Sequence, residues 1–227
     1  ATWLCLKYGP HGGGHGHPDK LNIVTYGAGR AFGLDPGSIA YGVPLHQEWY
    51  RTTIAHNTVT VDGANQGVAD GAAGQWLAEG QVTRFTGSAD AVYPGVKLSR
   101  ELRLSPGQLE DRFVCASETE HIYDWAFHAP GKLTVSVKTV PRDGPLGAAN
   151  GYQHVTEVAS ASTDEVWTAE WENGGAKLTL RFKAAAGTQV FTGVGPGRDP
   201  ADKVPVLIVR RQAANTVFDA VHRFTGR

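Results

Sequence analysis

Long apolar runs and a surplus of charge of either sign are both missing from this sequence. No stretch approaches the roughly 18 to 20 consecutive apolar residues of a membrane-spanning helix, and no charged-then-apolar leader opens the chain. The 21 basic and 22 acidic side chains leave a formal net charge of −1. Without a general positive field or a basic stripe, an acidic partner has to be recognised locally. We therefore expect no membrane partner and no nucleic-acid partner.

Methionine is absent, and cysteine occurs only at positions 5 and 115. Cys5 and Cys115 lie in apolar, strand-like stretches, which favours two buried thiols over a disulfide. These two residues do not decide the redox compartment. Because no Met is present and Ala1 leads directly into the strand-like stretch 3–8, we expect the chain to be part of a larger protein.

Alternating apolar and β-branched residues are abundant, and 29 glycines and 12 prolines interrupt them. The alternation predicts strands, because side chains point to opposite faces along a strand. The expected strands are 21–26, 58–61, 96–104, 109–115, 121–127, 133–140, 166–171, 176–182 and 204–210. Turn motifs separate them, and no stretch between them has a sustained helical period. The prediction is an all-β fold, a large antiparallel β-sandwich of stacked sheets.

Composition divides the chain unevenly. Residues 1–66 hold the His, Gly and Asn clusters, whereas residues 80–227 consist of regular strand patterns. The hydrophobic fraction of 41% and the charged fraction of 19% are typical of a globular protein. We expect one domain over residues 1–227, with the chemistry in 1–66 and the scaffold sheets in 80–227. The segment 63–80, rich in Gly and Ala, is expected to be a loop.

Three histidines fall within seven positions of a glycine-rich stretch, at His11, His15 and His17. This composition cannot pack as a core element, so the backbone must turn tightly or approach something closely. The stretch lacks the Gly-Lys-Ser/Thr ending and the following helix of a phosphate-binding loop. If the chain is extended through His15-Gly16-His17, both imidazoles lie on the same face and can share a site.

Two later residues complete a possible metal site. Asp35 alone is most simply a turn cap, and His56, at the start of a strand, is most simply structural. Together with His17 they offer two imidazoles and one carboxylate, an acceptable set of ligands for Zn²⁺. Their spacing is too long for a local finger but suits ligands brought together on neighbouring strands. Asn57 either orients His56 or caps the strand start.

Taken together, these motifs resemble the heparinase II/III family of bacterial polysaccharide lyases, most closely its oligoalginate lyase branch. The resemblance is strict over residues 7–66, and the later stretches 124–128 and 192–197 fit the family's sandwich. The motifs that carry it are KYGPHGGGHGHPDKL at 7–21, DPG at 35–37, YG at 41–42, WYR at 49–51 and TIAHNTVTVDG at 53–63.

The resemblance implies a β-sandwich that follows an N-terminal α/α toroid, with the substrate in the cleft between them. It implies one structural zinc ion held by His17, Asp35 and His56. It also implies a catalytic-site role for His15, and more loosely a sugar contact at Tyr41. The toroid would supply a catalytic Tyr with a His and an Asn or Gln, and this chain contains none of those motifs. We therefore expect the missing toroid of the same protein to be a partner.

The implied activity is β-elimination on an acidic oligo- or polysaccharide. The C5 proton of a uronate is removed and the 4-linked sugar is expelled, which leaves an unsaturated uronate. Alginate and heparin- or heparan-like glycans are the expected substrates, and the isolated chain is expected to be nearly inactive. The substrate class implies a periplasmic or secreted protein.

Two other classes of function stay open. A non-catalytic carbohydrate-binding sandwich would present exposed aromatic side chains, but it does not explain the histidine clusters. A metal-dependent hydrolase would need an open metal position and a nearby acid or base. Asp19 and Glu48 are the candidates for that role, although Asp19 fits a turn residue and Glu48 a solvated one.

Overall fold

Strand β7 (Val96–Ser105) shows how the alternating sequence folds. Its residues Val96, Leu98 and Leu102 are buried on one face, whereas Lys97 and Glu101 are exposed on the other. The structure is a computed structural model and describes residues 1–226. All the paired strands run antiparallel, so the predicted all-β antiparallel fold is confirmed. Within residues 1–226, no helix is long and apolar enough to cross a membrane.

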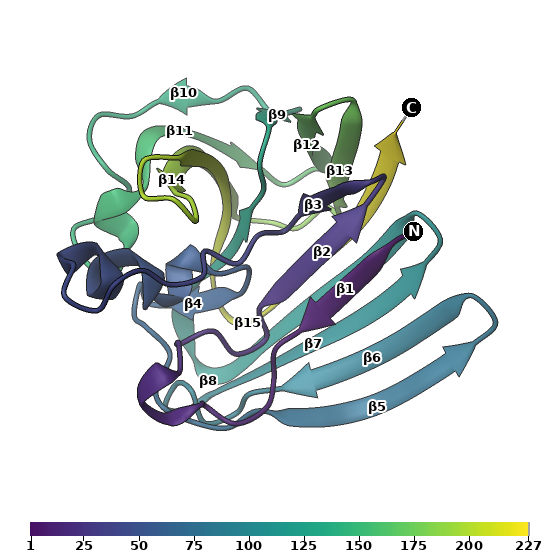
Figure 1. The fold of residues 1–227 in the computed structure, drawn as a ribbon, viewed down its shortest axis with the longest axis horizontal. Helices are drawn as coiled ribbons and strands as arrows, with labels where there is room; N and C mark the ends of the chain where they lie inside the picture. The colour runs from purple at the N-terminus through teal and green to yellow at the C-terminus, as the bar shows by residue number, and fades with distance from the viewer. Residues whose placement is uncertain (227) are drawn as a thin grey trace.

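The strands form a three-stranded sheet and a twelve-stranded sheet (Figure 1). The small sheet contains β1 (Trp3–Leu6), β2 (Ile23–Gly27) and β3 (Arg30–Phe32). The large sheet contains β4 (Val59–Val61), β5 (Ala72–Glu79), β6 (Val82–Ser88), β7 (Val96–Ser105), β8 (Gln108–His128), β9 (Lys132–Val135), β10 (Val140–Pro141), β11 (Thr156–Thr163), β12 (Trp167–Asn173), β13 (Ala176–Phe182), β14 (Thr188–Pro196) and β15 (Lys203–Gly226). The helical segments are single turns: η1 (Gly13–His15), η2 (His46–Tyr50), η3 (Thr53–Ala55) and η4 (Tyr152–His154).

Two long strands, β8 and β15, link the halves of the large sheet. They pair with each other along most of their length, with a register shift between Ala213 and Asn215. Residues 203–210 of β15 pair with β14, whereas residues 220–226 pair with β13. A bulge increases local twist and bends a strand, which allows both strands to continue from one layer into the next.

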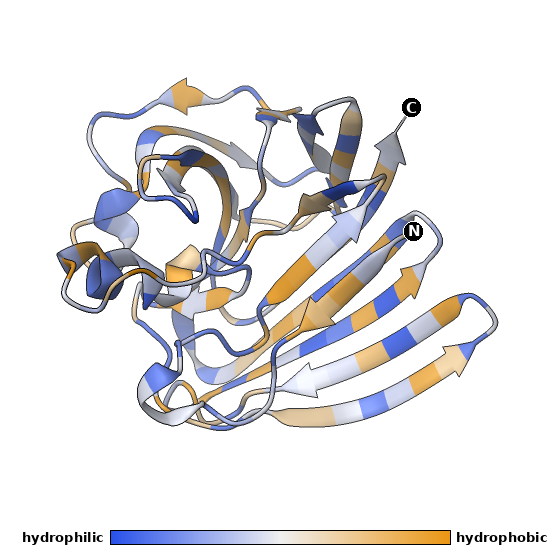
Figure 2. Ribbon diagram, in the orientation of Figure 1, coloured by the Kyte–Doolittle hydropathy of each residue, from blue (hydrophilic) through white to orange (hydrophobic). Residues whose placement is uncertain are grey.

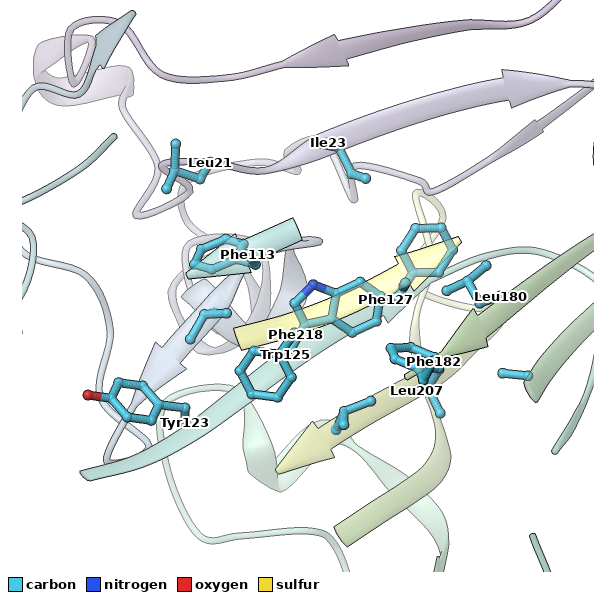
Figure 3. Packing of buried hydrophobic residues seen from close by; sticks show 14 of the residues in the cluster. Leu21, Ile23, Phe113, Tyr123, Trp125, Phe127, Leu180, Phe182, Leu207 and Phe218 are labelled. Carbon is cyan, nitrogen blue, oxygen red and sulfur yellow. The ribbon is translucent and has the colours of Figure 1, made fainter. Parts of the chain in front are cut away.

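The core lies between the two layers that these strands connect. Trp125 of β8 meets Phe182 of β13 edge to face, with ring centroids 5.4 Å apart, and Phe127 meets Trp171 in the same way. Figure 3 shows Trp125, Phe127 and Phe182 together with side chains from β2 and β15. Leu21 and Ile23 attach the small sheet to the same core. The stacked-sheet prediction is therefore confirmed.

Several local predictions differ from the structure. Segment 63–80 is not all loop, because 72–79 forms β5 at the edge of the large sheet. All of its residues are exposed, so no buried face imposes the alternation that marks an inner strand (Figure 2). Stretch 133–140 is strand only over β9 and residue 140 of β10. The expected runs also did not include β6, β11 and β14.

The two cysteines lie in different environments. Cys115 is buried in β8, and burial raises the pKa of its thiol. Cys5 is exposed in β1, so the prediction of two buried thiols is wrong for Cys5. β1 is an edge strand of the small sheet, and its alternate side chains face solvent. Both thiols are free, which agrees with the expectation of no disulfide.

Candidate active site and metal centre

The glycine-rich loop after β1 forms a tight turn that requires its glycines. Gly12 and Gly13 have φ values of +88° and +61°, in the left-handed region that residues with a Cβ rarely adopt. At Gly16 a Cβ atom would lie 2.0 Å from the carbonyl oxygen of His11. The Gly16 carbonyl also accepts a hydrogen bond of 2.8 Å from Arg51. The loop is therefore held in one shape on both sides of Gly16.

His15 ends this turn and is exposed to solvent. Its Nδ1 lies 2.6 Å from the hydroxyl oxygen of Tyr41, which is 59% exposed. The Tyr41 ring packs against the buried His46 ring with centroids 4.5 Å apart. The structure thus brings together the predicted catalytic residue and the predicted sugar contact, and both side chains are accessible.

His17 lies on the other side of Gly16 and faces His56 instead. Its Nδ1 is 3.5 Å from the Nε2 of His56. The expectation that His15 and His17 share one face of an extended strand is wrong, because the backbone turns through η1 immediately before Gly16. The loop therefore sends one imidazole outward and one inward.

The His56 ring presents an unprotonated nitrogen to His17. His56 is fully buried, and its Nδ1 donates a hydrogen bond of 2.8 Å to the carbonyl oxygen of Thr52. This bond fixes the tautomer and leaves the Nε2 lone pair free. Burial, followed by the neighbouring His56, lowers the pKa of His17 to about 4. Two imidazoles whose ring nitrogens face each other at this distance suit a shared cation.

Asp19 joins the two histidines. One ligand atom from each of His17, Asp19 and His56 lies within 4.8 Å of the others. Asp19 is 2% exposed, and its Oδ2 accepts a hydrogen bond of 2.5 Å from Lys7. Its Oδ1 is buried without a hydrogen-bond partner among the described residues. The interpretation of Asp19 as a turn residue misses this role, because its burial depends on loops that are distant in sequence.

Asp35 lies beside His56, with 3.9 Å between its Oδ2 and the His56 Nε2. The Oδ2 atom accepts a hydrogen bond from the side chain of Asn22, and Oδ1 accepts one from the backbone of Gly37. Asp35 therefore caps a turn and also faces the histidine pair. The three side chains whose ligand atoms converge are therefore His17, Asp19 and His56, whereas the predicted ligand Asp35 lies beside this group and approaches it through His56. Imidazole nitrogens and carboxylate oxygens are donors that Zn²⁺ accepts. These residues lie in loops at the ends of strands rather than on three neighbouring strands.

Asn57 does not contact His56 through its side chain. Its amide nitrogen donates to the carbonyl oxygens of Ile23 and Leu34, and its Oδ1 accepts from the backbone of His128. Through these hydrogen bonds Asn57 connects the backbones of β2, of β8 and of the segment that follows β3. Glu48 is half exposed and lies 3.2 Å from His154, which agrees with its expected solvated position.

Sequence reasoning missed several residues that shape the site: Lys7, Asp19, His46, Arg51 and Thr52. Asp19 could have been found because it follows His17 by two positions. Thr52 acts through its backbone carbonyl, for which no side-chain pattern exists. Arg51 acts on a carbonyl 35 residues away, so only the folded chain reveals its partner.

Comparisons with protein families and with known proteins identify similar sequences. Residues 1–200 match the family described as heparinase II/III-like, C-terminal. An alginate lyase of Stenotrophomonas maltophilia (strain K279a) is 29% identical over 227 aligned positions, which cover 87% of this chain and 30% of the relative. A heparin-sulfate lyase of Pedobacter heparinus is 31% identical over 80 positions, 34% of this chain and 12% of the relative.

Solved structures share the fold. A heparan sulfate lyase from Pedobacter heparinus superposes with a TM-score of 0.74 at 17% identity, covering all of this chain and 33% of the lyase. A galactose mutarotase related enzyme from Lactobacillus acidophilus gives 0.53 at 9% identity, covering 100% of this chain and 98% of that one. The chain thus spans about a third of the length of the alginate lyase and of the heparan sulfate lyase structure.

Proposed function

Because this chain belongs to the heparinase II/III-like C-terminal family, we propose that it is the β-sandwich part of a polysaccharide lyase that cleaves uronate-containing glycans by β-elimination. The observation that carries the proposal is the exposed His15–Tyr41 pair, held by a rigid loop directly beside a buried group of metal-binding side chains. The relatives described as alginate and heparin-sulfate lyases support a substrate of this class.

In β-elimination, a base removes the C5 proton, a C4–C5 double bond forms, and the oxygen at C4 leaves with a proton. We assign one proton-transfer or charge-neutralising role to His15, because its imidazole is exposed and can reach a bound sugar. The 2.6 Å hydrogen bond between its Nδ1 and the Tyr41 hydroxyl orients that ring. Tyr41 also contacts the sugar in this proposal, since more than half of its surface is accessible.

His17, Asp35 and His56 would hold the zinc ion, with Asp19 as an additional oxygen donor. When bound, the ion would supply a structural cross-link between loops that are distant in sequence. His56 is already oriented by the carbonyl of Thr52, as is typical of a metal-binding histidine. With the ion bound, these residues would fix the backbone that follows Gly16. The fixed backbone would in turn direct His15 outward.

The remaining catalytic groups belong, in this proposal, to an α/α toroid elsewhere in the same protein. The residues 1–66 form one wall of the cleft and the sheets of 80–227 support it. Placing groups from two domains around one proton makes catalysis depend on both, so this chain alone is expected to be nearly inactive. A substrate of this class would be met in the periplasm or outside the cell, and we propose that location for the protein.

The test is His15→Ala in a protein that carries this chain together with its helical domain. We expect turnover to fall by about 10²- to 10⁴-fold, measured by absorbance of the unsaturated product on alginate and heparan oligomers. His121→Ala is the matched control, because His121 contacts Asp62 and lies in β8. Wild-type turnover in His15→Ala, or a loss of glycan affinity without loss of rate, would instead support a binding module.

A further inference from the structure

A groove lies on the large sheet, and none of its lining residues belongs to the candidate site. It is open, has a volume of about 540 Å³ and crosses β10, β11, β14 and β15. Val140 pairs with Ser160, and Ser160 pairs with Phe191. Directly opposed residues point to the same face of a sheet. These three side chains therefore form one row across the floor of the groove.

A polar row runs parallel to the first. Ser162 pairs with Gln189, and Gln189 pairs with Arg210. Ser162 and Gln189 are each two positions from a member of the first row, so both rows share a face. The groove therefore presents two hydroxyls, an amide and a guanidinium beside the exposed Val140.

The carboxylate of Asp124 in β8 fixes Arg210 in place. Its Nε and Nη2 donate hydrogen bonds of 2.7 and 2.8 Å to the two carboxylate oxygens of Asp124. Asp124 is 1% exposed and also accepts a hydrogen bond from the Tyr152 hydroxyl. A guanidinium has five N–H donors, so the bidentate pair leaves Nη1 available to the groove. Arg210 is therefore a preorganised donor that loses little freedom when it binds a ligand.

Arg142 provides the charge that is not neutralised. Its guanidinium lies 5.5 Å from the centre of the Phe191 ring, and that of Arg210 lies 5.0 Å from the same ring. Within residues 1–226, the Arg142 side chain has no ion pair and no hydrogen bond. No lining residue is acidic. Arg142 and Arg210 both lie over the Phe191 ring, and Asp124 neutralises only Arg210. The groove therefore carries a net positive charge.

We propose that this groove binds a uronic-acid residue of an acidic glycan, as a site separate from the catalytic cleft. The sugar carboxylate accepts hydrogen bonds from Arg142 and from Nη1 of Arg210, the geometry that guanidiniums recognise best. Ser160, Ser162 and Gln189 bond the sugar hydroxyls, and Val140, 61% exposed, packs against the C–H face of the ring. A simple inorganic anion would use only the two arginines.

The test is calorimetric titration of this chain with sodium glucuronate, glucose and sodium sulfate. We expect saturable binding of glucuronate and none of glucose, and perturbed backbone NMR signals at 160–162 and 189–191. Arg142→Ala should weaken glucuronate binding on the order of tenfold, because it removes a charge-assisted contact without a structural partner. Arg84→Ala is the matched control, an exposed arginine of β6 that does not line this groove, and should bind as the wild type does.

A second variant separates a sugar site from an anion site. Ser162→Ala should weaken binding of glucuronate and leave that of sulfate unchanged. Sulfate binding as tight as that of glucuronate, equal loss in the Arg84 variant, or no glucuronate binding would each overturn the proposal. His15→Ala should leave this binding unchanged, so the result does not depend on whether the proposed lyase activity is correct.

Discussion

Arg100 is a fully buried charge that connects the scaffold to the candidate site. Its Nε and Nη2 donate to Asp111, while Nη1 donates to the carbonyl oxygens of Leu21 and Asn57, each at 2.6 Å. Burial would raise the pKa of Asp111, but Arg100 outweighs it and lowers that pKa to about 2. Asn57 directly follows His56 in the chain. The ion pair therefore holds the backbone next to His56, a candidate metal ligand.

His222 is fully buried and lies against the same pair. Its Nε2 is 3.4 Å from Asp111 without a well-aligned hydrogen bond, and its ring meets Phe127 edge to face. Burial, together with the charge of Arg100, lowers the pKa of His222, although Asp111 opposes the shift. An unfolded histidine binds a proton near pH 6.5. As pH falls below 6.5, protonation therefore favours the unfolded state.

His222→Phe should remove this source of acid sensitivity. Between pH 7 and pH 5, the unfolding free energy of the wild type should fall more steeply than that of the variant, by up to about 2 kcal/mol. Urea unfolding at several pH values measures the two slopes, and the remaining histidines contribute equally to both proteins. Parallel slopes would show that His222 binds protons equally in the folded and unfolded states, so that burial does not shift its pKa.

Single glycines control how the loops and strands of the site approach one another. Gly16 places its Cα against the His11 carbonyl, and Gly27 of β2 lies against the Phe224 ring of β15. The first contact shapes the loop that carries His15. The second contact allows the small sheet to pack closely against the large sheet.

Gly16→Ala should lower turnover of the proposed lyase by about 100-fold, because a Cβ displaces the loop and hence the His15 imidazole. Gly14→Ala is the matched control, since a Cβ there meets nothing within 4 Å. Product absorbance gives the rates, and thermal unfolding shows whether the fold is retained. Equal activity of the two variants would contradict a rigid placement of His15.

Gly27→Ala should destabilise the chain by about 1–3 kcal/mol, because a Cβ would lie 2.3 Å from the Phe224 ring. Gly9→Ala should have little effect, since the space around Gly9 is open. Denaturant unfolding compares the two variants. An unchanged midpoint for Gly27→Ala would mean that β2 can shift away from β15 at little cost.

In the whole molecule, the loops around the candidate site join sequence positions that are far apart. His17 follows β1, Asp35 follows β3 and His56 precedes β4. A cation held by all three would link the small sheet to the large one. Its binding energy would then add to the stability of the entire chain, because the unfolded chain has no such arrangement.

Zinc should therefore raise the melting temperature of this chain, by roughly 5–10 °C when its concentration is about 100 times the dissociation constant. A chelator should reverse the shift. His56→Ala should abolish the response, whereas His154→Ala should keep it, since His154 contacts Glu48 outside the cluster. A wild-type melting temperature that does not respond to zinc would exclude the proposed structural metal.

Local sequence predicted much of the strand pattern and the loop that carries the candidate site. The alternation in 96–104 and 176–182 reports a buried and an exposed face, which is a property of neighbouring residues. The glycines around His15 and His17 indicated a tight, exposed loop, because such a stretch has too little side chain to form a core. Both conclusions depend on short-range chemistry, and the structure agrees with them.

Other features depend on which segments meet in space. β5 has no buried face and is a strand only because β6 supplies its hydrogen bonds. Asp19 is a ligand candidate only because His56, 37 positions later, folds against it. The directions of His15 and His17 follow from a turn that Arg51 and His11 hold. Sequence alone determined the all-β class and the site-bearing loop, whereas tertiary packing decided which side chains converge, because convergence depends on register and bends between distant strands.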